Sequence, residues 1–308
     1  MLRYTIRRIL QIIPVFFIAT LLIFLIIRAL PGDPVRAIGG ERTMLPETRQ
    51  ALIERYDLDK NIFHQYVLYM GDLFQGDFGE SFANRRQVND IFREAVPRTL
   101  RLAGLAVAIQ AVVGIPLGIY SAMRRNRFGD HAVLVTTILM LAMPVFVVAT
   151  LSQVYIGVKW GVLPVSGVRD GFKSYLMPAM IIGITGLAVT TRLMRGSIID
   201  TMREDYIRTA KAKGMKARRV LGIHALRNAL IPVITVLAID LGALLGGTIV
   251  TESVFNIPGL GFQITRAITS RDNTIVIGMS VMLIMAYLLI NLIVDLLYAW
   301  LDPRIRYE

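Results

Sequence analysis

The stretch that decides the fold is ILQIIPVFFIATLLIFLIIRAL, from Ile9 to Leu30. It is apolar at nearly every position, and its length suits the roughly 20 residues that an α-helix needs to cross about 30 Å of hydrocarbon. A secretory signal has a shorter apolar core, of about 7–15 residues, followed by small residues at a cleavage site. This run is longer and no such site follows, so it predicts a retained membrane-spanning helix.

Five further runs share this length and composition. They are Thr99–Met123, Ala132–Ile156, Leu176–Met194, Pro232–Phe255 and Ile275–Leu301. The chain of 308 residues is 55% hydrophobic with a mean hydropathy of +0.57, so a soluble fold would leave too much apolar surface to bury. We therefore expect an all-α polytopic membrane protein, a bundle of six transmembrane helices.

The distribution of the formal net charge of +12 predicts the orientation of the chain. Basic residues gather before span one (Arg3, Arg7 and Arg8) and between spans two and three (Arg124, Arg125 and Arg127). They gather again between spans four and five (Arg195 to Arg227) and after span six (Arg304 and Arg306). Residues 31–98 hold nine Lys or Arg against eleven Asp or Glu. This positive-inside bias predicts that both termini lie in the cytoplasm. Because topology accounts for the charge, no nucleic-acid partner is expected.

The expected domain boundaries follow from these spans. Residues 1–30 form a cytoplasmic tail and the first span, 31–98 an extracytoplasmic helical insertion, 97–301 a core of five spans with a cytoplasmic segment at 200–231, and 302–308 a second cytoplasmic tail. The insertion is expected to be helical because apolar residues recur at helical spacing, and because Pro46 suits the first turn of an earlier helix ending near Tyr56; the spaced residues are Phe63, Tyr66, Val67, Met70 and Phe74. It either covers the outer mouth of the bundle or docks a binding protein.

Glycine and proline indicate how the spans pack and connect. Gly242, Gly246 and Gly247 permit close backbone approach, and Pro144 predicts a kink within the third span. Such helices either pack against their neighbours or form the wall of a transport pathway. The outer segments Gly157–Tyr175 and Asn256–Thr274 are expected to be short loops rich in Gly and Pro.

Catalytic and nucleotide-binding patterns are missing from the sequence. His64, His131 and His224 fall in three different segments outside the predicted spans, and the chain has no cysteine to bind a metal or form a disulfide. It also lacks the Gly-x4-Gly-Lys-Ser/Thr loop that binds nucleotide phosphates. We therefore expect that the chain is not itself an enzyme and holds no metal.

Three carboxylates fall within or near the ends of the predicted spans: Asp240, Glu252 and Asp295. A charge at the bilayer centre costs about 2.5–3.5 kcal/mol on insertion scales, so each needs an explanation. They either pair with neighbouring helices or a partner subunit, or contact the substrate or a coupling ion in the translocation pathway. The second interpretation includes a secondary transporter that uses Asp240 and Asp295 as proton sites.

The cytoplasmic segment from Met202 to Pro232 is the most informative part of the chain. Gly214 is expected to divide it into two short helices; the apolar residues are Tyr206, Ile207 and Ala210 in the first, and Val220, Ile223, Leu226 and Leu230 in the second. Its basic residues suit contact with anionic lipid headgroups. The small residues Thr209, Ala210 and Gly214 favour instead a slim helix that lies in a groove of another protein, because a membrane-surface helix anchors itself with bulky residues.

At these residues the sequence resembles the cytoplasmic coupling motif of bacterial ABC importer permeases, Glu-Ala-Ala-x3-Gly, with Arg208-Thr-Ala-x3-Gly214 in its place. It resembles more narrowly the dipeptide and oligopeptide permease (DppB/OppB) family, through Tyr206-Ile-Arg-Thr-Ala-x-Ala-Lys-Gly214, His224-Ala-Leu-Arg-Asn228 and Ile231-Pro232. The resemblance covers the whole chain, including Leu30-Pro-Gly-Asp-Pro34, Gly76-Asp-Phe-Gly79, Phe255-Asn-Ile-Pro-Gly-Leu-Gly261 and Asp302-Pro-Arg-Ile-Arg-Tyr307.

The resemblance implies a type I ABC importer transmembrane domain in a bacterial cytoplasmic (inner) membrane. Such a permease pairs with a second homologous permease, docks two ATP-binding cassette subunits and receives its substrate from an extracytoplasmic substrate-binding protein. The partners would bind ATP, so this chain needs no cofactor. The implied ATPase-coupling residues are Tyr206, Thr209, Ala210, Lys213 and Gly214. The implied cargo is a dipeptide or oligopeptide, with nickel or glutathione as alternatives.

Overall fold

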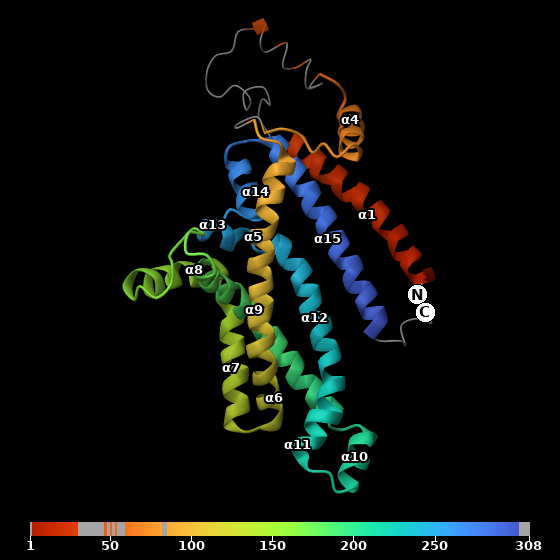
Figure 1. Cartoon of the computed structure of the whole chain (residues 1–308), viewed down its shortest axis with the longest axis vertical. Helices are drawn as coiled ribbons and strands as arrows, with labels where there is room; N and C mark the ends of the chain where they lie inside the picture. Colours follow the sequence, from red (N-terminus) through yellow and green to blue (C-terminus); the bar gives the residue numbers. More distant parts are fainter. Residues whose placement is uncertain are drawn as a thin grey trace. The chain divides into compact units, whose positions relative to one another are not determined.

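The computed structural model describes residues 2–29, 46–47, 50, 53, 59–81 and 85–301, and within these ranges every regular element is a helix (Figure 1). Five helices are long and apolar enough to cross a membrane, and a sixth span results if one bent pair is counted as a single crossing. They are Thr5–Ala29, Val88–Met123, Lys173–Thr201, Ala217–Gly246 and Asn273–Leu296, with the pair Phe128–Ala142 and Val145–Lys159. Each overlaps one predicted run. The prediction of an all-α bundle is therefore confirmed.

The helices divide into two compact units, of which the first comprises the described parts of residues 1–99 and 258–292. Its elements are α1 (Leu2–Ala29), α4 (Ile62–Phe74), the first part of α5 (Val88–Ile109), α14 (Leu260–Thr269) and most of α15 (Asn273–Leu301). The hydroxyl groups of Tyr66 and Thr20 share a hydrogen bond of 2.9 Å, and the Phe24 ring lies 5.6 Å from that of Tyr66. Residues 62–74 of the expected insertion are thus confirmed as helical and pack on α1, whereas nearly all of the earlier helix falls outside the described residues.

Helix α14 lies in the segment Asn256–Thr274, for which we expected only a loop. That expectation was wrong, because Leu260, Ile264 and Ala267 recur at helical spacing and are buried in the core of the first unit. The glycine and proline that suggested a loop stand only at the start of the helix, where Gly259 is the N-cap residue. The buried Ser81 hydroxyl donates a hydrogen bond of 2.6 Å to Asp272, just after α14.

The second unit comprises residues 100–257 and the described residues after 292. Its elements are the end of α5, η1 (Gln110–Gly114), α6 (Ile115–Met123), α7 (Phe128–Ala142), α8 (Val145–Ser152), η2 (Gln153–Lys159), α9 (Lys173–Thr201), α10 (Asp205–Ala212), α11 (Ala217–Arg219), η3 (Val220–Ala225), α12 (Leu226–Gly247) and α13 (Ile249–Val254), with the end of α15. The η elements are π-helical turns within longer helices. Helix α9 is the centre of this unit, since α6, α7 and α12 all pack against it.

Helices α6 and α9 approach closely because glycines line their contact. A Cβ atom on Gly118 of α6 would lie 2.6 Å from the Cβ of Met194 and from the Thr191 carbonyl oxygen on α9. On α9, Gly186 leaves space for the side chain of Gln110, whose amide group would clash with an added Cβ. Small residues are the usual means of bringing membrane helices together. These two glycines were not among those predicted from the sequence to permit close packing.

The third predicted span is broken at Pro144 rather than kinked. Helices α7 and α8 meet at 95°, with Met143 and Pro144 both in extended conformation (Figure 1). Proline lacks an N–H and disfavours helical backbone at the preceding residue, so α7 ends before Met143 and α8 starts after Pro144. The position of the bend is confirmed, and its size exceeds that of an ordinary proline kink.

Candidate coupling site

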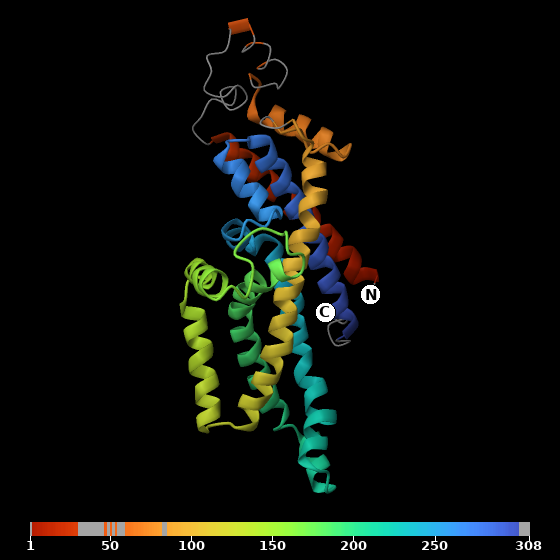
Figure 2. The ribbon, with the colours of Figure 1, turned by 60° about the vertical axis from the view of Figure 1, so that its left-hand side comes forward.

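Helix α10 is the structured part of the segment that resembles the coupling motif. Figures 1 and 2 show it beyond the ends of α6 and α7, at the same end of the second unit as α11. Its inner face is held by Ile207 and Ala210, which are 0% and 6% exposed and pack with Val220 and Ala225 of η3. The buried face of this short helix therefore packs firmly against η3 of its own subunit.

A Schellman motif ends α10 at Gly214. The Gly214 N–H donates to the Lys211 carbonyl at 2.9 Å, and the Met215 N–H donates to the Ala210 carbonyl at 3.3 Å. Gly214 has a φ of +78°, which costs glycine little but other residues more. Met215 packs against the cluster that contains Ala210, which is the apolar contact that usually accompanies this motif.

The expectation of two short helices around Gly214 was correct for the first and wrong for the second. After Gly214 the chain forms α11, η3 and α12 as one continuous span, Ala217–Gly246, with Pro232 inside it. A proline is tolerated in a membrane helix where neighbouring groups satisfy the freed backbone carbonyl. The coupling segment is thus a single short helix joined by a glycine turn to the start of a long one.

The structure distributes the five predicted coupling residues over two faces of α10. Tyr206 and Thr209 are exposed, as are Lys213 and Gly214 at its end, whereas Ala210 is buried against η3. The side-chain amide of Asn228 donates a hydrogen bond of 2.8 Å to the Tyr206 hydroxyl, which fixes that ring at the surface. Only the four exposed residues, Tyr206, Thr209, Lys213 and Gly214, are therefore available to another subunit.

A buried ion pair joins α9, the helix that leads into α10, to α7. Arg195 of α9 donates two hydrogen bonds of 2.7 Å to the carboxylate of Asp130 on α7, one to each oxygen. Asp130 also accepts from the Ser121 hydroxyl at 2.5 Å and from the Asn126 N–H at 2.9 Å, so its charge is fully solvated by protein. The Asp130 side chain is 0% exposed and that of Arg195 21%. This pair was not predicted from the sequence, because 65 residues separate its members.

The three predicted intramembrane carboxylates lie on different helices, α12, α13 and α15. Glu252 is completely buried and accepts a hydrogen bond of 2.9 Å from the Thr248 hydroxyl one turn earlier, so its contact with a neighbouring helix or a partner subunit stays a prediction. Asp240 is half-buried and has no hydrogen-bond or ion-pair partner within the described part of the chain. Asp295 is also half-buried. Whether Asp240 or Asp295 meets a partner subunit or a substrate stays a prediction.

Two family profiles together match nearly the entire chain. The profile described as "Binding-protein-dependent transport system inner membrane component" matches residues 114–307, and the profile for the N-terminal part of the corresponding membrane component matches residues 1–103. The chain belongs to this family. It is therefore a multi-pass permease component of a transport system, and the first match includes α10, Gly214 and the Asp130–Arg195 pair.

Full-length relatives carry the names of short-peptide and glutathione permeases. The chain is 36% identical over 335 residues to the di/tripeptide transport system permease protein DppB of Pseudomonas aeruginosa (strain UCBPP-PA14), and 38% identical over 312 residues to the glutathione transport system permease protein GsiC of Escherichia coli (strain K12). It is 35% identical over 338 residues to the dipeptide transport system permease protein DppB of the same Escherichia coli strain. Each alignment covers 100% of both chains. The resemblance to the DppB/OppB family is confirmed.

Solved ABC transporters share the fold of this permease at low sequence identity. A chain of an amino acid ABC transporter solved with histidines matches 68% of this permease and 94% of its own length, with a TM-score of 0.52 and 16% identity. A chain of the inward-facing MetNI methionine ABC transporter matches 69% and 96%, with a TM-score of 0.53 and 16% identity. These matches show the ABC transporter transmembrane fold and carry no information about cargo.

Proposed function

We propose that this permease is a transmembrane subunit of an ATP-driven importer that carries dipeptides and oligopeptides across the bacterial cytoplasmic membrane. The observation that carries the proposal is full-length identity of 35–38% to permeases named for dipeptides, di/tripeptides and glutathione. Glutathione is itself a tripeptide, so these names describe one chemical class. Nickel stays an alternative cargo, and no feature of the described residues favours it.

The permease would act with a second homologous permease, two ATP-binding cassette subunits that bind the ATP, and an extracytoplasmic substrate-binding protein. The positive-inside charge pattern supports cytoplasmic termini and a cytoplasmic α10. The exposed face of α10 would enter a groove on the ATPase. Because the buried face of α10 packs on η3, a movement of α10 with the ATPase would be transmitted through η3 to α12. Closure of two ATPases on ATP would bring two such helices together and open the membrane cavity outward.

The exposed Thr209 offers the sharpest test of ATPase docking. Thr209 stands on the outer face of α10 with its hydroxyl bonded to the Asp205 carbonyl at 3.0 Å, so replacing it disturbs no tertiary contact. A Thr209→Trp variant should reach the membrane normally and lose the co-purifying ATPase, because the indole would not fit the groove. Thr269→Trp is the matched control, since Thr269 is also exposed on a helix and bonds the carbonyl four residues earlier at 2.9 Å. Equal ATPase recovery with both variants would refute docking through α10.

Cargo is tested separately by competition. Uptake of a labelled dipeptide by the assembled transporter should fall when unlabelled dipeptide or tripeptide is added, and should persist with a nickel chelate. Competition by unlabelled glutathione, measured in the same assay, distinguishes a peptide permease from a glutathione permease. A transporter that ignores every peptide and responds to the nickel chelate would overturn the peptide assignment and leave the ATPase docking proposal intact.

A further inference from the structure

A pocket of about 400 Å³ lies within the second unit beside the coupling segment. It is formed by the end of α6 and the following turn, the end of α9, and the start of the helix formed by α11 and η3. Its lining residues are Ala122, Met123, Arg125, Ile198, Ile199, Met202, Arg203, Ala217, Arg218 and Leu221. Because α6 and α9 end here, the pocket stands at the ends of two helices that are long and apolar enough to cross a membrane.

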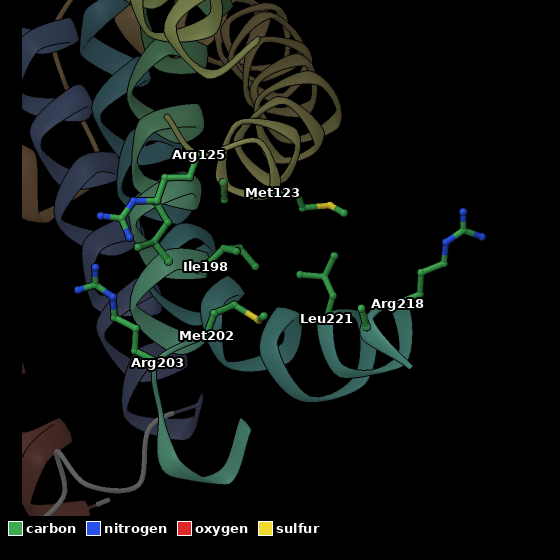
Figure 3. A pocket seen from close by; sticks show the side chains of 10 residues that line it. Met123, Arg125, Ile198, Met202, Arg203, Arg218 and Leu221 are labelled. Atoms are coloured by element: carbon green, nitrogen blue, oxygen red, sulfur yellow. The ribbon is translucent and has the colours of Figure 1, made fainter. Parts of the chain in front are cut away.

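The interior of the pocket is apolar and open. Figure 3 shows the side chains of Met123, Ile198, Met202 and Leu221 around its centre. Met123 is 64% exposed although it is a large apolar residue at the end of a membrane span. An exposed apolar cavity at this depth suits a hydrocarbon chain better than a water-soluble ligand.

Every charged residue that lines the pocket is an arginine. Figure 3 shows the guanidinium groups of Arg125 and Arg203 on the same side of the pocket, whereas Arg218 points away from it. None of these three side chains has an ion pair or hydrogen bond within the described part of the chain, and no carboxylate lines the pocket. An apolar cavity with an unneutralised positive rim is complementary to an anionic amphiphile.

We propose that this pocket binds one anionic phospholipid of the inner leaflet, with an acyl chain against the apolar lining and the phosphate between Arg125 and Arg203. The proposal rests on the orientation in the proposed function, which places the pocket on the cytoplasmic side. Basic pockets between membrane helices on that side are suited to anionic headgroups. A lipid held here would connect the turn after α6 to the end of α9, immediately before α10.

The test is native mass spectrometry of the full-length permease purified with its partners, titrated with phosphatidylglycerol or with phosphatidylcholine. We expect one phosphatidylglycerol per permease, bound about tenfold more tightly than phosphatidylcholine. The Arg125→Gln/Arg203→Gln variant should lose this preference. The Arg127→Gln/Arg219→Gln variant should keep it, because it removes the same charge from exposed positions of neighbouring segments outside the pocket.

Three results of the lipid titration would overturn the proposal. They are equal phosphatidylglycerol binding by wild type and by Arg125→Gln/Arg203→Gln, an equal loss in both double variants, and displacement of the lipid by inorganic phosphate alone. A photo-crosslinking amino acid at Met123 that captures a partner protein instead of lipid would also overturn it. Failure of the proposed function is distinguishable, because it would appear as the absence of ATPase from the purified assembly whatever the lipid count.

Discussion

Arg195 and Asp130 form a bidentate ion pair, with both hydrogen bonds 2.7 Å long, between α9 and the first turn of α7. Ser121 and the backbone of Asn126 bind the same carboxylate, so the pair also fixes the turn between α6 and α7. Helix α9 ends at Thr201 and α10 begins at Asp205. The pair thus connects the α6–α7 turn to the helix that carries the coupling segment.

Removing one partner of this pair should destabilise the permease. Asp130→Asn leaves the guanidinium of Arg195 without its counter-charge, and we expect a loss of about 3 kcal/mol, measured as a lower melting temperature of the detergent-purified protein. The loss stays at the lower end of the range for buried pairs because the Arg195 side chain is 21% exposed. Asp130→Asn/Arg195→Gln should recover part of the stability, since neither charge remains.

The exposed pair Asp205–Arg208 is the control for this prediction. Its atoms are 3.4 Å apart and its side chains are 94% and 74% exposed, so Asp205→Asn should change stability very little. If Asp130→Asn melts at the wild-type temperature, or if the double variant is less stable than either single variant, the structural role of the buried pair is wrong.

Gly118→Ala should weaken the packing of α6 on α9. The added methyl group would meet the Thr191 carbonyl and the Met194 Cβ at 2.6 Å, and neither backbone can yield without moving a helix. Gly104→Ala is the control, because Gly104 lies on α5 with nothing within 4 Å of the added Cβ and alanine favours a helix. Thermal stability should fall for Gly118→Ala and stay or rise for Gly104→Ala. The opposite order would contradict the close approach of these helices.

Substitutions at Gly214 should follow backbone preference rather than size. Asparagine tolerates a φ of +78°, whereas a β-branched residue does not, so Gly214→Asn should preserve α10 and Gly214→Val should unravel its last turn. Hydrogen exchange of residues 207–213 would report this, with residues 229–237 of α12 as an internal reference. Equal protection in both variants would show that the Schellman motif does not hold α10.

The orientation can be tested directly because the chain contains no cysteine. Lys213 and Val67 are both exposed, at the end of α10 and on α4 respectively. A membrane-impermeant thiol reagent added to intact cells should label Val67→Cys and reach Lys213→Cys only after the membrane is opened. The reverse pattern would invert the proposed topology.

Local chemistry accounts for what the sequence predicted correctly. Long apolar runs predict spans because about 20 apolar residues match the hydrocarbon thickness, and these spans are helical because an unpaired backbone is too costly there. Pro144 and Gly214 mark a break and a turn because each restricts or permits particular backbone angles. These effects act within a few residues of the chain, so no tertiary information is needed to find them.

Contacts between distant segments were not predictable in this way. The partner of Asp130 is 65 residues away, and the neighbours of Gly118 stand on another helix, so neither follows from periodicity. Ala210 was predicted as part of a docking surface from its small size and from the resemblance to the coupling motif, but the structure shows it on the inner face of α10, packed with Val220 and Ala225. The apolar spacing of Leu260, Ile264 and Ala267 did contain the signal for α14, which the flanking Gly and Pro obscured.

The most direct test of the central claim is uptake of a labelled dipeptide by proteoliposomes that contain the purified transporter and its binding protein. We expect uptake that requires ATP and is lost with Thr209→Trp but not with Thr269→Trp. We also expect that Asp240→Asn/Asp295→Asn leaves the dependence on ATP unchanged. Uptake without ATP, driven by a proton gradient and abolished by Asp240→Asn/Asp295→Asn, would contradict the claim and identify a secondary transporter.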